Sequence, residues 1–202
     1  SPQPDRLFSG QTGQTEVLYH ASCCKYMQLG QDVISAGFLA IPAQAKERLN
    51  DIRRATGTIL YDTAAWAYPD VTRDTYEWRM NRMKRNALVV ADAINNDPVL
   101  SAHVEAIYPA SSGHQDFERA KTMDQTGGLL TFRFKGGALS KDTMDALAHN
   151  IIQDATQNSI DLANGESFGF GVPRIYVGWT PSNTFPPFLR LAVGDRTFDE
   201  SR

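Results

Sequence analysis

The sequence predicts a mixed α/β chain whose second half is a small α+β layer with an antiparallel sheet. The apolar run from Val33 to Ile41 is typical of a buried strand. Apolar residues spaced by three and four between Arg73 and Asn95 predict a long amphipathic helix. Strict alternation in LLTFRFK, residues 129–135, predicts a strand with one buried face and one wet face. Strands and helices mixed in this way favour an α+β arrangement for the second half.

The first half contains two predicted helices. Residues 1–18 carry several prolines and glycines and are expected to form a loop. A short amphipathic helix is predicted over residues 42–54. In the long helix that follows, the apolar stripe is interpreted as core packing, and Asp97-Pro98 ends the helix. The members of that stripe are Tyr76, Met80, Met83, Ala87, Val90 and Ile94.

The second half alternates short strands and helices. Strands are predicted over residues 104–108, 174–178 and 189–193, in addition to the alternating strand above. A short helix is predicted over residues 114–123. Ser140 can cap a further helix. The side chains of that helix expected to face inward are Met144, Leu147, Ala148 and Ile151.

Composition excludes several classes of protein. The chain has 202 residues, 42% of them hydrophobic, and a net charge of −3, so neither nucleic acid nor an anionic membrane is favoured as a partner. No apolar run approaches the ~20 residues of a membrane span, and no secretory leader opens the sequence. The adjacent Cys23 and Cys24 cannot form a disulfide framework, and the four histidines are scattered, so we expect a reducing cytoplasm and no metal site.

One lysine, Lys25, stands three residues after Ser22 and seven before Asp32. A lysine ahead of an apolar strand is most often a solvated surface residue. A buried lysine is costly as a charge and shifts its pKa readily, and this setting lets its amine act as a Schiff-base nucleophile. Spacing alone leaves both interpretations open.

The pattern Ser22-x-x-Lys25-Tyr26, followed by Asp32-Val33, resembles the lysine segment of the Cys/Met-metabolism family of pyridoxal-phosphate (PLP) enzymes. This family includes the cystathionine γ-synthases, the cystathionine γ-lyases and the methionine γ-lyases. Its usual pattern places a serine three residues before the lysine, a threonine directly before it, and Tyr-x-Gly-Gly-His-x-Asp-Val after it.

Two departures from that pattern are visible. Cys24 replaces the threonine, and residues 28–30, Gln-Leu-Gly, replace Gly-Gly-His. The resemblance implies that Lys25 forms the Schiff base with PLP and that Ser22 and Cys24 bind the cofactor. A thiol is a poorer hydrogen-bond donor than a hydroxyl.

The resemblance continues in order from about residue 13 to residue 200. Asn86-Ala87 matches the family's long helix that links its large domain to its small one. Tyr108-Pro109, His114 and the stretch from Gly127 to Gly137 are similar to the family's small domain.

Two further segments resemble the family's substrate-binding residues. Residues 189–194, LRLAVG, resemble Arg-Leu-Ser-Val-Gly, whose arginine binds the substrate α-carboxylate, so Arg190 is implied in that role. A planar guanidinium suits this because it donates two parallel charge-assisted hydrogen bonds. Glu166-Ser167-Phe168-Gly169 resembles Glu-Ser-Leu-Gly, which implies Ser167 beside the carboxylate and Glu166 facing the substrate side chain. The alternatives are a wet-face strand arginine and a turn near Gly165.

The resemblance implies the C-terminal part of a fold-type-I PLP-dependent transferase. Residues 1–60 would be the end of the PLP-binding large domain, residues 61–97 the linking segment and long helix, and residues 98–202 the small α+β domain. The implied activity is that of an amino-acid lyase or transferase, with β/γ-elimination or γ-replacement on sulfur or related amino acids. The alternative is a non-catalytic interaction module that has kept the fold.

The resemblance also implies partners. A small amino-acid substrate, a homodimer or homotetramer, and the N-terminal half of the same enzyme are expected. In the family, the phosphate-binding glycine loop, the ring-stacking tyrosine and the pyridinium-partner aspartate precede the lysine. No such motif precedes Lys25. We therefore expect this chain alone to be inactive.

Overall fold

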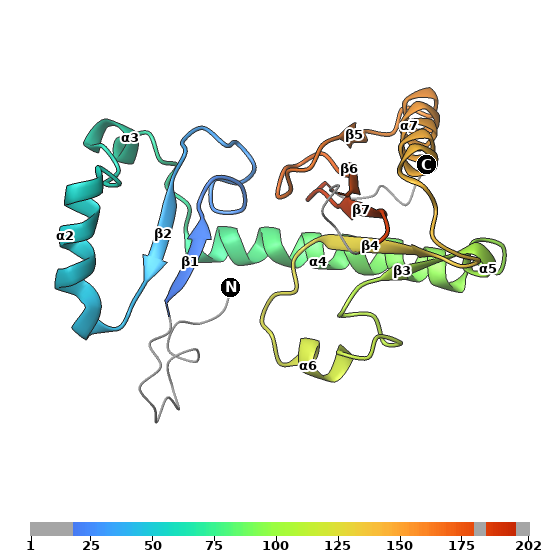
Figure 1. Cartoon of the computed structure of the whole chain (residues 1–202), viewed down its shortest axis with the longest axis horizontal. Coiled ribbons are helices and arrows are strands. Elements are labelled where there is room, and N and C mark those ends of the chain that lie inside the picture. Colours follow the sequence, from blue (N-terminus) through green and yellow to red (C-terminus); the bar gives the residue numbers. More distant parts are fainter. Residues whose placement is uncertain (1–17, 180–184, 197–202) are drawn as a thin grey trace. The chain divides into compact units, whose positions relative to one another are not determined.

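The computed structural model of the chain describes residues 18–179 and 185–196 (Figure 1). The chain divides into two compact units, residues 1–72 and residues 73–202. Most of the loop expected at residues 1–18 lies outside the described residues.

The first unit contains a two-stranded antiparallel sheet and two helices. Strand β1 (Tyr19–Ser22) pairs with β2 (Gly37–Ala40), so that Ser22 lies opposite Gly37. A 3-10 turn, η1 (Ala43–Ala45), leads into α2 (Lys46–Thr56), and α3 (Asp62–Trp66) follows. The predicted helix over residues 42–54 is therefore confirmed.

The prediction of a buried strand from Val33 to Ile41 is wrong in its length and its burial. Strand β2 covers four residues, and the side chains of Val33 and Leu39 are 61% and 41% exposed. The strand cannot start at Val33 because both backbone groups of Ile34 are hydrogen-bonded to a buried side chain of the preceding turn. Within the described residues, β2 pairs only with β1.

The second unit begins with the long helix α4 (Arg73–Asn96), which confirms the predicted helix. Met80, Met83 and Ala87 from the apolar stripe are buried, as core packing requires. The helix also buries two polar side chains, Arg79 and Asn86. Asp97 follows the helix, and its carboxylate accepts hydrogen bonds from the next backbone amides.

A five-stranded sheet with the order β3-β4-β7-β6-β5 forms the centre of this unit (Figure 1). All neighbours are antiparallel except β5 and β6, so the predicted antiparallel sheet is confirmed but for its short edge strand. The strands are β3 (Val104–Ile107), β4 (Leu129–Phe134), β5 (Ala163–Asn164), β6 (Arg174–Gly178) and β7 (Phe188–Ala192).

Three more helices accompany the sheet: α5 (Leu100–His103), α6 (Phe117–Lys121) and α7 (Lys141–Gln157). Helix α4 contacts β3 and β4, whereas α7 contacts β5, β6 and β7. Ser140 caps α7 as predicted, because its hydroxyl oxygen accepts a hydrogen bond from the Thr143 amide at 3.2 Å. The predicted helix over residues 114–123 is shorter than expected and covers five residues.

The sheet has one apolar face and one polar face. Leu130, Ile175 and Leu189 are buried on the first, and residues directly opposite each other share a face in antiparallel pairs. The second face carries Thr131, Arg190 and Tyr176 side by side, because Thr131 and Tyr176 both lie opposite Arg190. The polar face predicted for the strand LLTFRFK therefore extends across three strands.

Candidate functional site

The turn that carries Lys25 is built around Gln28, whose side chain is fully buried. Its amide nitrogen Nε2 donates to the carbonyl oxygens of Cys23, at 3.0 Å, and Ile34, at 2.6 Å. Its Oε1 accepts from the Ile34 amide at 2.9 Å. One side chain thus joins both ends of the loop, and the Gly30 amide closes the turn on the Lys25 carbonyl at 2.7 Å.

Sequence reasoning treated residues 28–30 only as a departure from the family pattern. It missed the structural role of Gln28, because a glutamine in a short turn gives no periodic signal. The structure shows that the replacement supplies three hydrogen bonds to buried backbone groups of the turn, two of them to Ile34.

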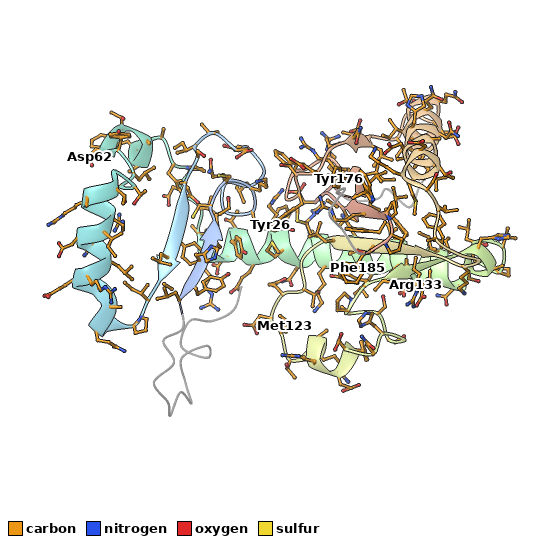
Figure 2. All side chains as sticks on the ribbon, in the orientation of Figure 1. Tyr26, Asp62, Met123, Arg133, Tyr176 and Phe185 are labelled. Atoms are coloured by element: carbon orange, nitrogen blue, oxygen red, sulfur yellow. The ribbon has the colours of Figure 1, made fainter. Side chains whose placement is uncertain are left out.

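Ser22 and Cys24 lie next to Lys25 at the end of β1. The Ser22 hydroxyl oxygen accepts a hydrogen bond from the Cys24 amide at 3.2 Å. The Cys24 thiol donates to the Ala36 carbonyl at 3.5 Å. The Ser22 hydroxyl and then the Ala36 backbone lower the pKa of the Cys24 thiol. Lys25 is half-buried in the turn, which Figure 2 marks by its neighbour Tyr26.

Of the three residues predicted to bind PLP, Lys25 and Ser22 have groups suited to it and Cys24 does not. Lys25 supplies an amine, and Ser22 supplies a hydroxyl, which can donate to a phosphate oxygen in place of the neighbouring Cys24 sulfur. The Cys24 thiol is already directed at the Ala36 carbonyl and is a weak donor. The turn can therefore hold the cofactor through Lys25 and Ser22, with Cys24 adding little.

Tyr68, also in the first unit, is hydrogen-bonded to the backbone of the Lys25 segment. The Tyr68 hydroxyl donates to the carbonyl oxygen of Cys23 at 3.4 Å. Burial, followed by the charge and hydrogen bond of Cys23, raises the pKa of Tyr68 to about 12. Burial likewise raises the pKa of the Cys23 thiol. Both groups are therefore neutral at physiological pH.

In the second unit, Glu166 and Ser167 lie on the loop between β5 and β6. Glu166 is exposed and Ser167 is half-buried. The Glu166 carbonyl accepts a hydrogen bond from Nη2 of Arg190. Three residues later, the Gly169 carbonyl accepts one from Nη2 of Arg79 at 2.8 Å. Two arginines thus fix the backbone on either side of Ser167.

The buried Arg79 also makes an ion pair. Its Nε donates to the Asp195 carboxylate at 2.6 Å, and the two side chains are 2% and 21% exposed. Asn86, two turns along α4, donates to the Gly194 carbonyl at 2.9 Å, and Arg82 donates to the Asp195 carbonyl at 2.7 Å. Helix α4 therefore positions both the loop of Ser167 and the chain that follows β7.

Sequence reasoning missed Arg79. A usable signal existed, because Arg79 lies three residues after Tyr76 and four before Met83 and so falls on the apolar stripe of the helix. A charged residue on a buried stripe requires a partner.

Arg190 lies on the polar face of the sheet, half-buried in β7. Its guanidinium lies over the rings of Tyr176, at 5.3 Å, and Phe168, at 5.9 Å. Figure 2 labels Tyr176 on β6. The Nε of Arg190 is buried and has no hydrogen-bond partner among the described residues. Because Nη2 of Arg190 already donates to the Glu166 carbonyl and Nε is buried, Nη1 and the second hydrogen of Nη2 are the donors left for a carboxylate.

The predicted site residues thus form two clusters. Ser22, Cys24 and Lys25 lie together in the first unit, and Glu166, Ser167 and Arg190 lie together in the second. The described residues contain no group of three or more His, Cys, Asp or Glu side chains that could hold a metal. Among the helices described, none is long and apolar enough to cross a membrane.

Comparison with protein families identifies the chain. Residues 13–157 match the model of the Cys/Met metabolism PLP-dependent enzymes. The chain belongs to this family. It is 30% identical over 190 residues to the bifunctional enzyme flvA of Aspergillus flavus, and 29% identical over 125 residues to the L-methionine gamma-lyase of Fusobacterium nucleatum. The matches cover 91% and 60% of this chain, but only 22% and 30% of those relatives.

Solved structures of this family show the fold. Cystathionine gamma-lyase from Lactobacillus plantarum, complexed with L-serine, matches 89% of this chain with a TM-score of 0.64 at 18% identity. The methionine gamma lyase CalE6 from Micromonospora echinospora gives the same TM-score, identity and coverage of this chain. The chain covers 46% and 47% of those two structures. It therefore has an α/β fold that matches part of the fold-type-I PLP enzymes.

Proposed function

We propose that this chain carries the lysine and the carboxylate-binding residues of a PLP-dependent amino-acid lyase or transferase. The observation that carries the proposal is Lys25 on an ordered turn beside Ser22, in a member of a PLP-dependent family. The reaction class is β/γ-elimination or γ-replacement on sulfur or related amino acids. The cystathionine and methionine enzymes among the similar structures support this class.

Each residue has a defined task in this proposal. Lys25 holds the cofactor through its amine and, once displaced by substrate, serves as the base that moves a proton from Cα. Ser22 donates to the cofactor phosphate. PLP itself supplies an electron sink for the negative charge that forms at Cα.

The substrate would be held in the second unit. Arg190 binds its α-carboxylate, because the guanidinium lies on the polar face of the sheet with Thr131 and Tyr176. Ser167 lies two residues before a carbonyl fixed by Arg79, so its hydroxyl can assist at the same carboxylate. Glu166 is exposed on this loop and can meet the amino group or side chain of a substrate.

We further propose a cytoplasmic protein that works as a homodimer or homotetramer, completed by an N-terminal half with the remaining cofactor-binding motifs. A second candidate is a non-catalytic interaction module that has kept the fold. The commitment of the Cys24 thiol to the Ala36 carbonyl favours this alternative, since it removes one phosphate donor.

Borohydride trapping tests the proposal. The chain is incubated with excess PLP and reduced, and the modified lysine is identified by peptide mapping. We expect Lys25 to take up the label in preference to the other lysines, with no turnover of cystathionine by this chain alone. Lys25→Ala should abolish the preference, and Lys46→Ala, at an exposed helix position, should preserve it. Even labelling of all lysines would contradict the assignment of Lys25.

A further inference from the structure

A second arginine, Arg174, lies on the same sheet face as Arg190. Arg174 in β6 is directly opposite Ala192 in β7, and Arg190 is two residues before Ala192. The two arginines are therefore diagonal neighbours, a relation that places Cα atoms about 7–8 Å apart. Tyr176, labelled in Figure 2, lies on this face opposite Arg190.

The guanidinium of Arg174 is held by stacking on an aromatic ring. It lies over the Phe170 ring at 3.7 Å from the ring centre. A β-carbon at Gly165 would lie 3.4 Å from its Cδ and its Nη1, so the side chain runs past this glycine at van der Waals distance. No described residue accepts a hydrogen bond from the Arg174 side chain, and its Nε is buried without a partner. Stacking fixes the plane, while the two Nη groups have no acceptor among the described residues and can donate to a ligand.

The charge of the two arginines is not balanced locally. Neither Arg174 nor Arg190 forms an ion pair with a carboxylate of the described residues. Glu166, on the loop between β5 and β6, binds Arg190 through its backbone carbonyl. By contrast, Arg133, on the same face at β4, is paired with Glu105. Like charges placed diagonally repel each other, and a ligand with two negative groups would relieve that repulsion.

We propose that Arg174 binds a side-chain carboxylate of the amino acid whose α-carboxylate is bound by Arg190. This inference rests on the proposed function for the role of Arg190. The polar face then selects acidic amino acids with a short side chain over neutral ones of equal length. Arg174 is thereby a specificity-determining residue, and the Phe170 ring positions it.

Binding to the 202-residue chain tests this without any turnover. The Nε–H resonances of the arginines are followed by NMR while L-glutamate or L-norvaline is added at constant ionic strength. The two probes have the same chain length and differ in the second carboxylate. One more charge-assisted bond to a carboxylate should make glutamate bind about tenfold to a hundredfold more tightly.

Three variants sharpen the result. Arg174→Leu should remove the preference for glutamate while norvaline binding persists, and Arg174→Lys should keep part of it through charge alone. Arg133→Leu is the matched control, a same-face arginine already paired with Glu105, and should keep the full preference. Backbone amide shifts that stay dispersed, and unchanged away from the substituted residue, show that each variant is folded.

Two results would overturn the inference: equal affinity of the wild-type chain for both probes, or a glutamate preference that survives in Arg174→Leu. Failure of the proposed function has a different signature. If Lys25 is not labelled by PLP but the Arg174-dependent preference is observed, the cofactor role fails and the two-arginine anion site stands.

Discussion

Replacing Asp195 by Asn tests the buried ion pair that joins α4 to the chain after β7. The substitution keeps the side chain's size and one acceptor oxygen but removes the negative charge. Arg79 would then keep its charge at 2% side-chain exposure without a counter-charge. A buried charge without a partner is expensive, and the surrounding backbone must move or admit water to compensate.

The size of the effect follows from the burial of both partners. Breaking a fully buried pair costs about 3–5 kcal/mol. The Asp195 side chain is 21% exposed, and the new amide can still accept from Arg79, so we expect the lower end, about 2–3 kcal/mol. For a unit of this size, about 4 °C of melting temperature per kcal/mol predicts a fall of about 8–12 °C.

Thermal unfolding followed by tryptophan fluorescence measures this. Trp66 belongs to the first unit and is 89% exposed, so a Trp66→Phe background leaves Trp78 and Trp179 to report on the second unit. Asp161→Asn is the matched control, because Asp161 pairs with an arginine at the surface of the same unit with 61% of its own side chain exposed. A surface pair is worth about 0–1 kcal/mol. Equal shifts for Asp195→Asn and Asp161→Asn would refute the argument.

Two further predictions concern the first unit. Gln28→Leu removes three hydrogen bonds to buried backbone groups. Hydrogen exchange at the Ile34 amide should therefore accelerate on the order of a hundredfold. The control Gln31→Leu, at an exposed position, should leave that exchange rate unchanged. The Tyr68 phenol, with its pKa raised to about 12, should ionise well after exposed tyrosines in an ultraviolet absorbance titration. Its folded pKa lies above the unfolded value of ~10, so its contribution to stability is complete below about pH 10 and is lost as the pH rises toward 12. Tyr68→Phe should remove that alkaline loss, and a Tyr68 that titrates with the exposed tyrosines would contradict the burial argument.

The parts of the fold that the sequence predicted are those with a strong local period. Helix α4 and strand β4 carry their periods over many residues, and the structure has both. Strand β5 has only two residues and left no pattern to detect. The run from Val33 to Ile41 led to a wrong prediction of a long buried strand. An apolar run indicates that residues tend to be buried, but it does not indicate which other elements cover them.

The candidate site divides in the same way. Lys25 and Arg190 were found through short motifs, and their roles stay predictions. The contacts that position these residues were not predictable, because they join distant parts of the chain. Arg79 reaches Gly169 and Asp195, which are 90 and 116 residues away. No local pattern specifies which backbone carbonyl a buried arginine will meet.

The turn after Lys25 also constrains how this sequence could have diverged from its family. Leu29 has a left-handed φ of 54°, at a position where the family pattern has glycine, and a branched side chain costs about 1 kcal/mol or more there. The hydrogen bonds of Gln28 hold that conformation in place. The two replacements are therefore epistatic: Gln28→Gly should be more damaging beside Leu29 than beside a glycine.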